Sequence, residues 1–267
     1  MNGKEIIAVV GSGTMGNGIA HISALSGYSV YLVDINNEFL DKAMSIISKN
    51  LQKQVDKGVI SESKKNSALD SINTTIDISN IKGADLVIEA APENQDIKNK
   101  IFSELDSICK PDTILASNTS SISITELSTK TNRPDKIIGM HFMNPVPIMK
   151  LVEIINGDKT SKETKNKIIT FANNMGKIPV ECNDYPGFVS NRILMPMIIM
   201  IFFTILAITL EIFVSEFLFL RRLFVPYCTS LLKTQKSIKI QTPKIILGIY
   251  ISVNSNSSSL FIYFTPP

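Results

Sequence analysis

Cysteine is scarce in this chain of 267 residues, which holds only Cys109, Cys182 and Cys228. The number is odd, the spacing is wide and no C-x-x-C pair occurs, so the sequence predicts neither a disulfide framework nor a metal site. The first residues also lack the long apolar core and small-residue cleavage site of a secretory signal. These absences indicate a protein of the reducing cytoplasm.

Charge of either sign is in little excess, and the formal net charge is +3. The excess lies in residues 193–267, where six basic and two acidic residues give +4, whereas the rest of the chain sums to −1. Nucleic-acid binding requires a patterned basic face with aromatic or helical context, which a basic tail alone does not provide. We therefore expect no nucleic-acid partner.

Apolar runs alternate with helix-permissive stretches over the first 184 residues. We predict helices at 14–26, 95–109 and 162–175, and strands at 5–10, 29–33, 85–88, 113–116, 137–140, 150–155 and 177–181. This alternation is typical of parallel α/β proteins with helices on both faces of the sheet. The sequence therefore predicts a doubly wound sheet, and the turn residues Tyr185-Pro186-Gly187 mark its boundary.

A glycine-rich turn follows the first predicted strand and opens the first helix. It reads Gly11-Ser-Gly13-Thr14-Met15-Gly16, and Asp34 ends the next strand 18 residues after Gly16. The glycines allow a tight turn, close backbone approach to a pyrophosphate and close helix packing, while the positive helix end favours the negative charge. Asp34 is placed to accept from ribose hydroxyls, which predicts NAD rather than NADP.

Only two histidines occur, His21 and His141. His21 falls inside the first helix, where we interpret it as an ordinary, partly buried residue. His141 ends an apolar strand, where open α/β sheets place reactive side chains, and Glu153 on the next strand is its apparent partner. A dehydrogenase acting on an alcohol needs a base near neutral pH, which histidine provides. From spacing alone, a strand-capping structural His141 fits as well as a catalytic one.

Three further motifs make a resemblance to a known family specific. They are Ser117-Asn-Thr-Ser120-Ser, the run from His141-Phe-Met-Asn-Pro to Leu-Val-Glu153, and Pro186-Gly-Phe-Val-Ser-Asn191-Arg. Together they resemble the 3-hydroxyacyl-CoA dehydrogenase family. The resemblance extends from about residue 4 to residue 197 and includes Glu89-Ala-Ala-Pro-Glu93 and Lys98. It implies a Rossmann-type fold, NAD as cofactor and an acyl-CoA substrate.

The resemblance also implies roles for individual residues. His141 is the catalytic base, Glu153 orients it, Ser120 contacts the substrate 3-oxygen, and Asn191 holds the thioester carbonyl or a neighbouring oxygen. Ser121 is the rival of Ser120, and only the motif separates them. The residues implied along the cofactor are Gly11, Gly13, Thr14, Met15, Gly16, Asp34, Glu93, Lys98 and Asn118, and those implied at the CoA moiety are Asn50, Lys53 and Lys57. A solvated helix face is the alternative for the two lysines at 53 and 57.

The composition changes after residue 198. Residues 193–210 carry no charge, and residues 193–267 contain no Asp and a single Gly. Members of the resembled family continue here into an all-α domain that closes the cleft and forms a homodimer. We therefore divide the chain into a Rossmann NAD-binding domain (1–185), the start of the helical domain (186–198) and an atypical apolar tail (199–267).

Two interpretations of the tail remain open. The composition changes abruptly after the motif at 186–192, which indicates a frameshift. The last 25 residues follow no helical or strand period, and this also favours a frameshift. The competing interpretation is a membrane segment, because 18 uncharged residues reach the lower limit of a span and Arg221-Arg222 provides a positive flank.

The leading hypothesis is an enzyme that reversibly oxidises an (S)-3-hydroxyacyl-CoA, such as 3-hydroxybutyryl-CoA, in butanoate or fatty-acid metabolism. Because half of the cleft and the dimer surface are missing, we expect weak or absent turnover, and the exposed apolar surface predicts aggregation. The alternatives are a membrane-tethered NAD-binding protein and an inactive remnant that keeps the motifs.

Overall fold

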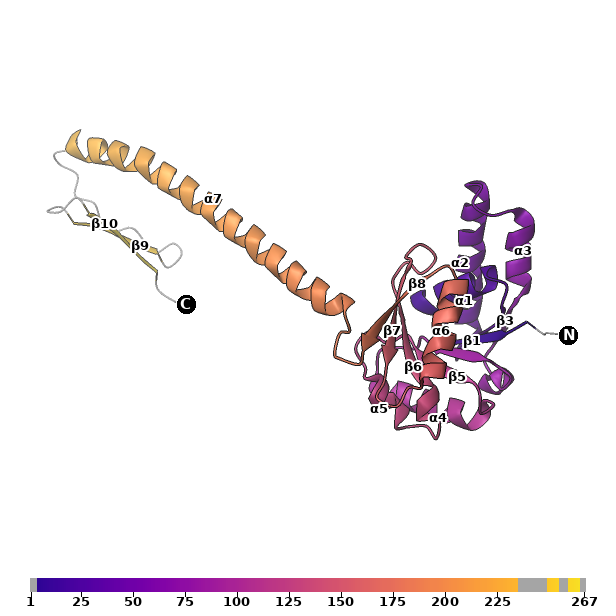
Figure 1. The fold of residues 1–267 in the computed structure, drawn as a ribbon. Coiled ribbons are helices and arrows are strands. Elements are labelled where there is room, and N and C mark those ends of the chain that lie inside the picture. Colours follow the sequence, from indigo (N-terminus) through magenta and orange to yellow (C-terminus); the bar gives the residue numbers. More distant parts are fainter. Residues whose placement is uncertain (1–3, 235–248, 255–258, 265–267) are drawn as a thin grey trace. The chain divides into compact units, whose positions relative to one another are not determined.

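The computed structural model of the protein describes residues 4–234, 249–254 and 259–264. Its main feature is an eight-stranded sheet with the order β3-β2-β1-β4-β5-β6-β7-β8 (Figure 1). The strands are β1 (Ile6–Val10), β2 (Ser29–Val33), β3 (Ile72–Thr75), β4 (Leu86–Glu89), β5 (Ile114–Ser117), β6 (Ile137–Phe142), β7 (Leu151–Asn156) and β8 (Ile178–Asn183). The order reverses beside β1, so the predicted doubly wound fold is confirmed.

Helices cover both faces of this sheet and form two cores. One core contains α1 (Thr14–Leu25), α2 (Asn37–Asp56), α3 (Glu62–Asp70) and α6 (Lys162–Asn174). The other contains α4 (Gln95–Ile108), α5 (Ile124–Ser128) and the short 3-10 helix η1 (Ile78–Ile81), while a second 3-10 helix, η2 (Pro134–Lys136), precedes β6. Along β1, Ile7 and Val9 face the first core and Ala8 and Val10 face the second. This alternation explains why the strand is apolar throughout.

The pairing of β6 with β7 departs from an all-parallel sheet. These strands run antiparallel, with His141 opposite Glu153. Only eight residues connect them, whereas a parallel crossover requires about a dozen or more. The short connection therefore fixes the antiparallel direction, and β8 then pairs with β7 in parallel.

The described contacts divide the chain into two units, Met1–Met200 and Ile201–Pro267. Helix α7 (Ser190–Thr234) begins in the first unit, and the second unit also contains the antiparallel pair β9 (Ile249–Asn254) and β10 (Ser259–Phe264). The apolar run at 193–210, one of whose interpretations is a membrane segment, lies within helix α7. Helix α7 has no glycine, and its residues 193–210 carry no charge, so this part of the helix shows no amphipathic period.

The first part of α7 holds no buried residue. Within Ser190–Phe213 an 18-residue window reaches a mean hydropathy of 2.7, and 0% of that window is buried within the structure. By length and composition this is one helix that is able to cross a membrane, although buried core helices and signal sequences pass the same test.

Candidate active site

The turn from β1 to α1 depends on glycine at two positions. Gly11 has a φ of +101°, and a Cβ there would lie 2.6 Å from the carbonyl oxygen of Ala90. A Cβ on Gly16 would lie 1.7 Å from the carbonyl oxygen of Gly11. Strand and helix therefore meet closely only because neither residue has a side chain.

The same turn fits a dinucleotide. A Cβ on Gly13 would meet nothing within 4 Å, and this residue caps α1 without a side-chain hydrogen bond. Amide groups of the first turn are therefore available to an anion. Thr14 is exposed beside them and Met15 is half-buried. Asp34 follows β2, and its Oδ2 accepts from the amide and hydroxyl of Ser12, at 2.6 Å each.

Ser120, His141 and Glu153 form a line of hydrogen bonds. The Nδ1 of His141 lies 2.8 Å from Glu153 Oε2, and its Nε2 lies 3.0 Å from Ser120 Oγ. A carboxylate only accepts hydrogen bonds, so Nδ1 carries the hydrogen and Nε2 of the neutral ring accepts from Ser120. His141 and Glu153 are both buried. The arrangement leaves Nε2 as the nitrogen that is able to take up a proton.

The second oxygen of Glu153 meets the start of α7. Oε1 accepts from the amides of Val189 (3.1 Å) and Ser190 (2.8 Å). Burial acts to raise the pKa of Glu153, but the hydrogen bonds from His141 and Ser190 outweigh it and lower the pKa below its ordinary value. One ionised group therefore supports both the histidine and the first turn of α7.

Two asparagines border this line. Asn191 lies at the start of α7 and donates from Nδ2 to the carbonyl oxygen of Ser120 at 3.4 Å. Asn118 follows β5, and its Oδ1 accepts from the amide of Phe142 at 2.9 Å. Asn118 thereby joins the ends of β5 and β6, which brings the Ser120 turn beside His141.

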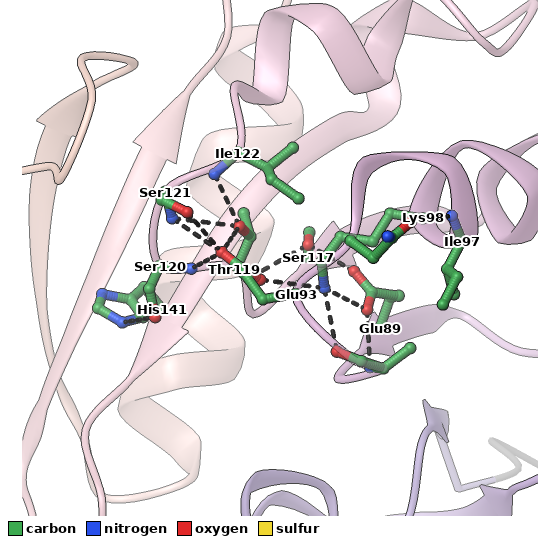
Figure 2. A network of polar contacts seen from close by, with 12 residues as sticks. Glu89, Glu93, Ile97, Lys98, Ser117, Thr119, Ser120, Ser121, Ile122 and His141 are labelled. Atoms are coloured by element: carbon green, nitrogen blue, oxygen red, sulfur yellow. Dashed lines mark hydrogen bonds and ion pairs between the residues drawn. The ribbon is translucent and has the colours of Figure 1, made fainter.

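Glu93 orders the turn that carries Ser120 (Figure 2). Its Oε1 accepts from the Thr119 hydroxyl (2.6 Å), the Ser120 amide (2.9 Å) and the Ser121 amide and hydroxyl (3.0 and 2.9 Å). Burial acts to raise the pKa of Glu93, but the hydrogen bonds from Thr119 and Ser121 and the charge of Lys98 outweigh it and lower the pKa. The Ser121 side chain thus bonds to Glu93, whereas that of Ser120 bonds to His141.

The predicted CoA-binding residues lie apart from this line of contacts. Lys53 and Lys57 are exposed at the end of α2, and Asn50 is half-buried one turn earlier. Within the described part of the chain, no hydrogen bond or ion pair joins their side chains to Ser120, His141 or Glu153. Their place at a CoA moiety stays a prediction.

Sequence reasoning assigned no role to three buried polar residues of this site. Glu89 ends β4, Ser117 ends β5 and Thr119 lies in the Ser120 turn, and all are at most 1% exposed. The sequence held a signal for Glu89, which is a charged residue at the end of a continuous apolar run. A charged residue in such a place is buried only when it has a partner of opposite charge.

Comparison with known proteins identifies the family. Residues 6–185 match the family described as 3-hydroxyacyl-CoA dehydrogenase, NAD binding domain. A probable 3-hydroxybutyryl-CoA dehydrogenase of Deinococcus radiodurans is 51% identical over 190 residues, which cover 71% of this chain and 68% of that protein. The 3-hydroxybutyryl-CoA dehydrogenase of Clostridioides difficile is 48% identical over 192 residues, covering 72% and 68%.

A solved structure supports the same assignment. The crystal structure of (S)-3-hydroxybutyryl-CoA dehydrogenase from Ralstonia eutropha has 44% sequence identity and a TM-score of 0.72, and the match covers 73% of this chain and 69% of that one. A glycine turn that fits a dinucleotide thus occurs together with a family match over most of the chain. The protein therefore belongs to the 3-hydroxyacyl-CoA dehydrogenase family and uses NAD as its cofactor.

Proposed function

We propose that the chain carries out the NAD-dependent, reversible oxidation of an (S)-3-hydroxyacyl-CoA, such as (S)-3-hydroxybutyryl-CoA, to the 3-oxoacyl-CoA. The observation that carries this proposal is the contact line from Ser120 through His141 to Glu153, beside a turn that fits a dinucleotide. An alcohol dehydrogenase requires a base next to its cofactor, and this line supplies one.

In the oxidative direction, the substrate hydroxyl takes a hydrogen bond from Ser120 and donates its proton to His141 Nε2. As that O–H bond breaks, the C–H electron pair at C3 leaves as hydride, and the C3–O bond becomes a carbonyl. The β1–α1 turn would hold NAD⁺, which would supply the acceptor for this hydride. Glu153, 2.8 Å from Nδ1, stabilises the resulting imidazolium. Asn191 holds the thioester end, so that C3 is fixed relative to Nε2.

The remaining proposed contacts position cofactor and substrate. Gly11, Gly13, Thr14, Met15 and Gly16 hold the pyrophosphate, and Asp34 accepts from the ribose hydroxyls. Glu93, Lys98 and Asn118 line the path of the cofactor from that turn to Ser120. Asn50, Lys53 and Lys57 on α2 contact the CoA moiety, where two cations suit its phosphates.

The decisive measurement is the absorbance change of NADH with acetoacetyl-CoA, for the unaltered chain and for His141→Ala. We expect weak turnover that disappears in the variant, while both proteins bind NADH. NADPH tested in parallel is expected to bind less tightly, because its 2′-phosphate meets the Asp34 carboxylate. Binding without any turnover would restrict the chain to cofactor binding, and turnover unchanged in His141→Ala would contradict the proposed base.

The proposed domain limits are 1–185, 186–198 and 199–267, with the last segment translated from a shifted reading frame. Support comes from the change in composition, since residues 193–267 contain no Asp and a single Gly. We accordingly propose a cytoplasmic enzyme in which the homodimer of the family is lost. Sequencing the coding DNA after the Met197 codon tests this. A second frame encoding amphipathic helices is expected, and an intact single frame would instead favour a membrane segment.

A further inference from the structure

Glu89 carries a carboxylate in a place without solvent. Its side chain is 0% exposed and that of Lys98 is 1% exposed. Oε1 accepts from the Lys98 ammonium (2.6 Å) and the Ala91 amide (2.7 Å), and Oε2 accepts from the Ser117 hydroxyl (2.6 Å) (Figure 2). An apolar pair of similar size would fill the space without the cost of desolvating two ions. Stability alone therefore does not explain the pair.

The same ammonium also faces a second carboxylate. It lies 3.5 Å from Glu93 Oε2, compared with 2.6 Å from Glu89 Oε1. Two carboxylates and one ammonium leave this group, which we call the Glu89–Lys98–Glu93 cluster, with one uncompensated negative charge. Glu93 is the more exposed acid, at 41%. The uncompensated charge therefore lies at Glu93, because Lys98 is held closer to Glu89.

Glu93 is in turn part of the turn that aims Ser120 at His141. Its Oε1 lies 2.9 Å from the Ser120 amide, and Ser120 Oγ lies 3.0 Å from His141 Nε2. Hydride transfer requires the reacting atoms to approach to about 3–3.5 Å. The nicotinamide ring must therefore lie beside the substrate carbon at Ser120, within the field of the Glu89–Lys98–Glu93 cluster.

We propose that Glu89 is a positioning residue that keeps Lys98 from neutralising Glu93, so that the cluster favours the oxidised cofactor over the reduced one. The nicotinamide ring carries one positive charge in NAD⁺ and none in NADH, so a negative charge beside it distinguishes the two. This inference rests on the proposed function, since it needs the nicotinamide at Ser120.

The test is the ratio of the two dissociation constants, measured on the full chain in non-ionic detergent. Fluorescence titration gives the Kd of NADH, and displacement by NAD⁺ gives the Kd of the oxidised form. Glu89→Gln removes one charge and releases Lys98 to Glu93. We expect the preference of the variant for NAD⁺ over NADH to shift toward NADH by on the order of tenfold, the effect of removing one unit charge beside a charged ring in a partly solvated site. A displacement of the turn that carries Ser120 would change the affinities for NADH and NAD⁺ alike. The ratio of the two dissociation constants therefore isolates the effect of the charge.

The double variant Glu89→Gln/Lys98→Met restores a single negative charge at Glu93, and its ratio is expected to return toward that of the unaltered chain. If Glu89 and Lys98 had only a structural role, the double variant would depart further from the unaltered chain than Glu89→Gln does, because both members of the pair are replaced. Glu163→Gln, an exposed acid on α6 paired with Lys167, is the control and is expected to leave the ratio unchanged. If Glu89→Gln does not fold, Glu93→Gln removes the same charge and is expected to shift the ratio in the same direction.

An unchanged ratio in folded Glu89→Gln, or a double variant that moves further toward NADH, would overturn this inference and leave the proposed function standing. Failure of the unaltered chain to bind either form of the cofactor would overturn the proposed function, and the inference with it.

Discussion

The two ring nitrogens of His141 have different partners, and this difference defines their chemistry. Nδ1 is fixed on Glu153, so only Nε2 exchanges a proton with a ligand of Ser120. Because Glu153 is buried and ionised, it favours the imidazolium that forms when Nε2 takes up the proton. In the proposed reaction, the carboxylate therefore stabilises a charge that exists only during turnover.

Glu153→Gln is expected to lower kcat by roughly 10²- to 10⁴-fold, the usual contribution of general acid–base catalysis. The amide replaces a charge that supports the imidazolium, whereas the cofactor turn is untouched, so the Kd of NADH is expected to stay unchanged. Steady-state kinetics with acetoacetyl-CoA and NADH titration measure the two quantities. Glu181→Gln, an exposed acid on β8, is the matched control. Equal kcat in the two variants would contradict the role of Glu153.

His21 gives a prediction about stability and pH. Burial, followed by the charge of Lys177, lowers its pKa from 6.5 to about 4. The native state therefore binds fewer protons than the unfolded state between these values, so its stability is full above pH 6.5 and falls as the pH drops toward 4. At most about 3 kcal/mol is lost in this way. In His21→Gln, denaturant unfolding is expected to show a flatter pH dependence over this window. An identical pH profile in the variant would contradict the buried, neutral histidine.

At the residue scale, the sequence predicted the chemistry better than the supporting contacts. The carboxylate expected beside His141 is indeed Glu153, because the strand ends that carry them are readable as apolar runs. The choice of Ser120 over Ser121 rested on the motif alone, since the contacts that separate the two serines depend on how Glu93 orders the turn. Glu89 was missed for a related reason: its partners, Lys98 and Ser117, come from separate elements that only the folded sheet brings together.

At the scale of elements, the β1–α1 turn separates two glycine roles that the motif alone does not distinguish. Gly16→Ala is expected to destabilise the fold by several kcal/mol, since its Cβ would lie 1.7 Å from backbone. Gly13→Ala is expected to leave the melting temperature nearly unchanged, because its Cβ meets nothing within 4 Å, but to weaken NADH binding, because it fills the pyrophosphate approach. Thermal unfolding and NADH titration of both variants measure this. Equal destabilisation by the two alanines would contradict the assignment.

Elements were predictable where their period was clear. Seven of the eight strands of the sheet lie within one or two residues of their predicted limits, because runs buried on both faces are apolar and bounded by turns. Strand β3 was not predicted, because Ile72–Thr75 contains a single apolar residue. The direction of β7 was not predictable, since it depends on the length of the connection from β6 rather than on the sequence of β7 itself. The apolar run at 193–210 indicated a membrane segment as one interpretation, but the full length of α7 was not predicted, because this run has no amphipathic period to follow.

At the scale of the whole molecule, the two units differ in whether their apolar side chains are buried or exposed. The first unit buries its apolar strands between two layers of helices, whereas the apolar side chains described on α7 are exposed. We expect the full chain to need detergent, and a chain ending at Met200 to elute from size exclusion as a smaller species with the same Kd for NADH. Loss of NADH binding in the shortened chain would show that the first unit depends on the second.

Glu153 also has a mechanical consequence. The carboxylate bonded to His141 accepts the amides at the entry to α7, so part of a pull along that helix is delivered through Glu153 to the proposed catalytic base. Attachment of the chain to a surface through its C-terminus would put this joint under tension, whereas attachment through the N-terminus would not. Rates recorded on a protein immobilised in these two ways would therefore differ, and the difference would report how stiffly the helix entry is coupled to proton transfer.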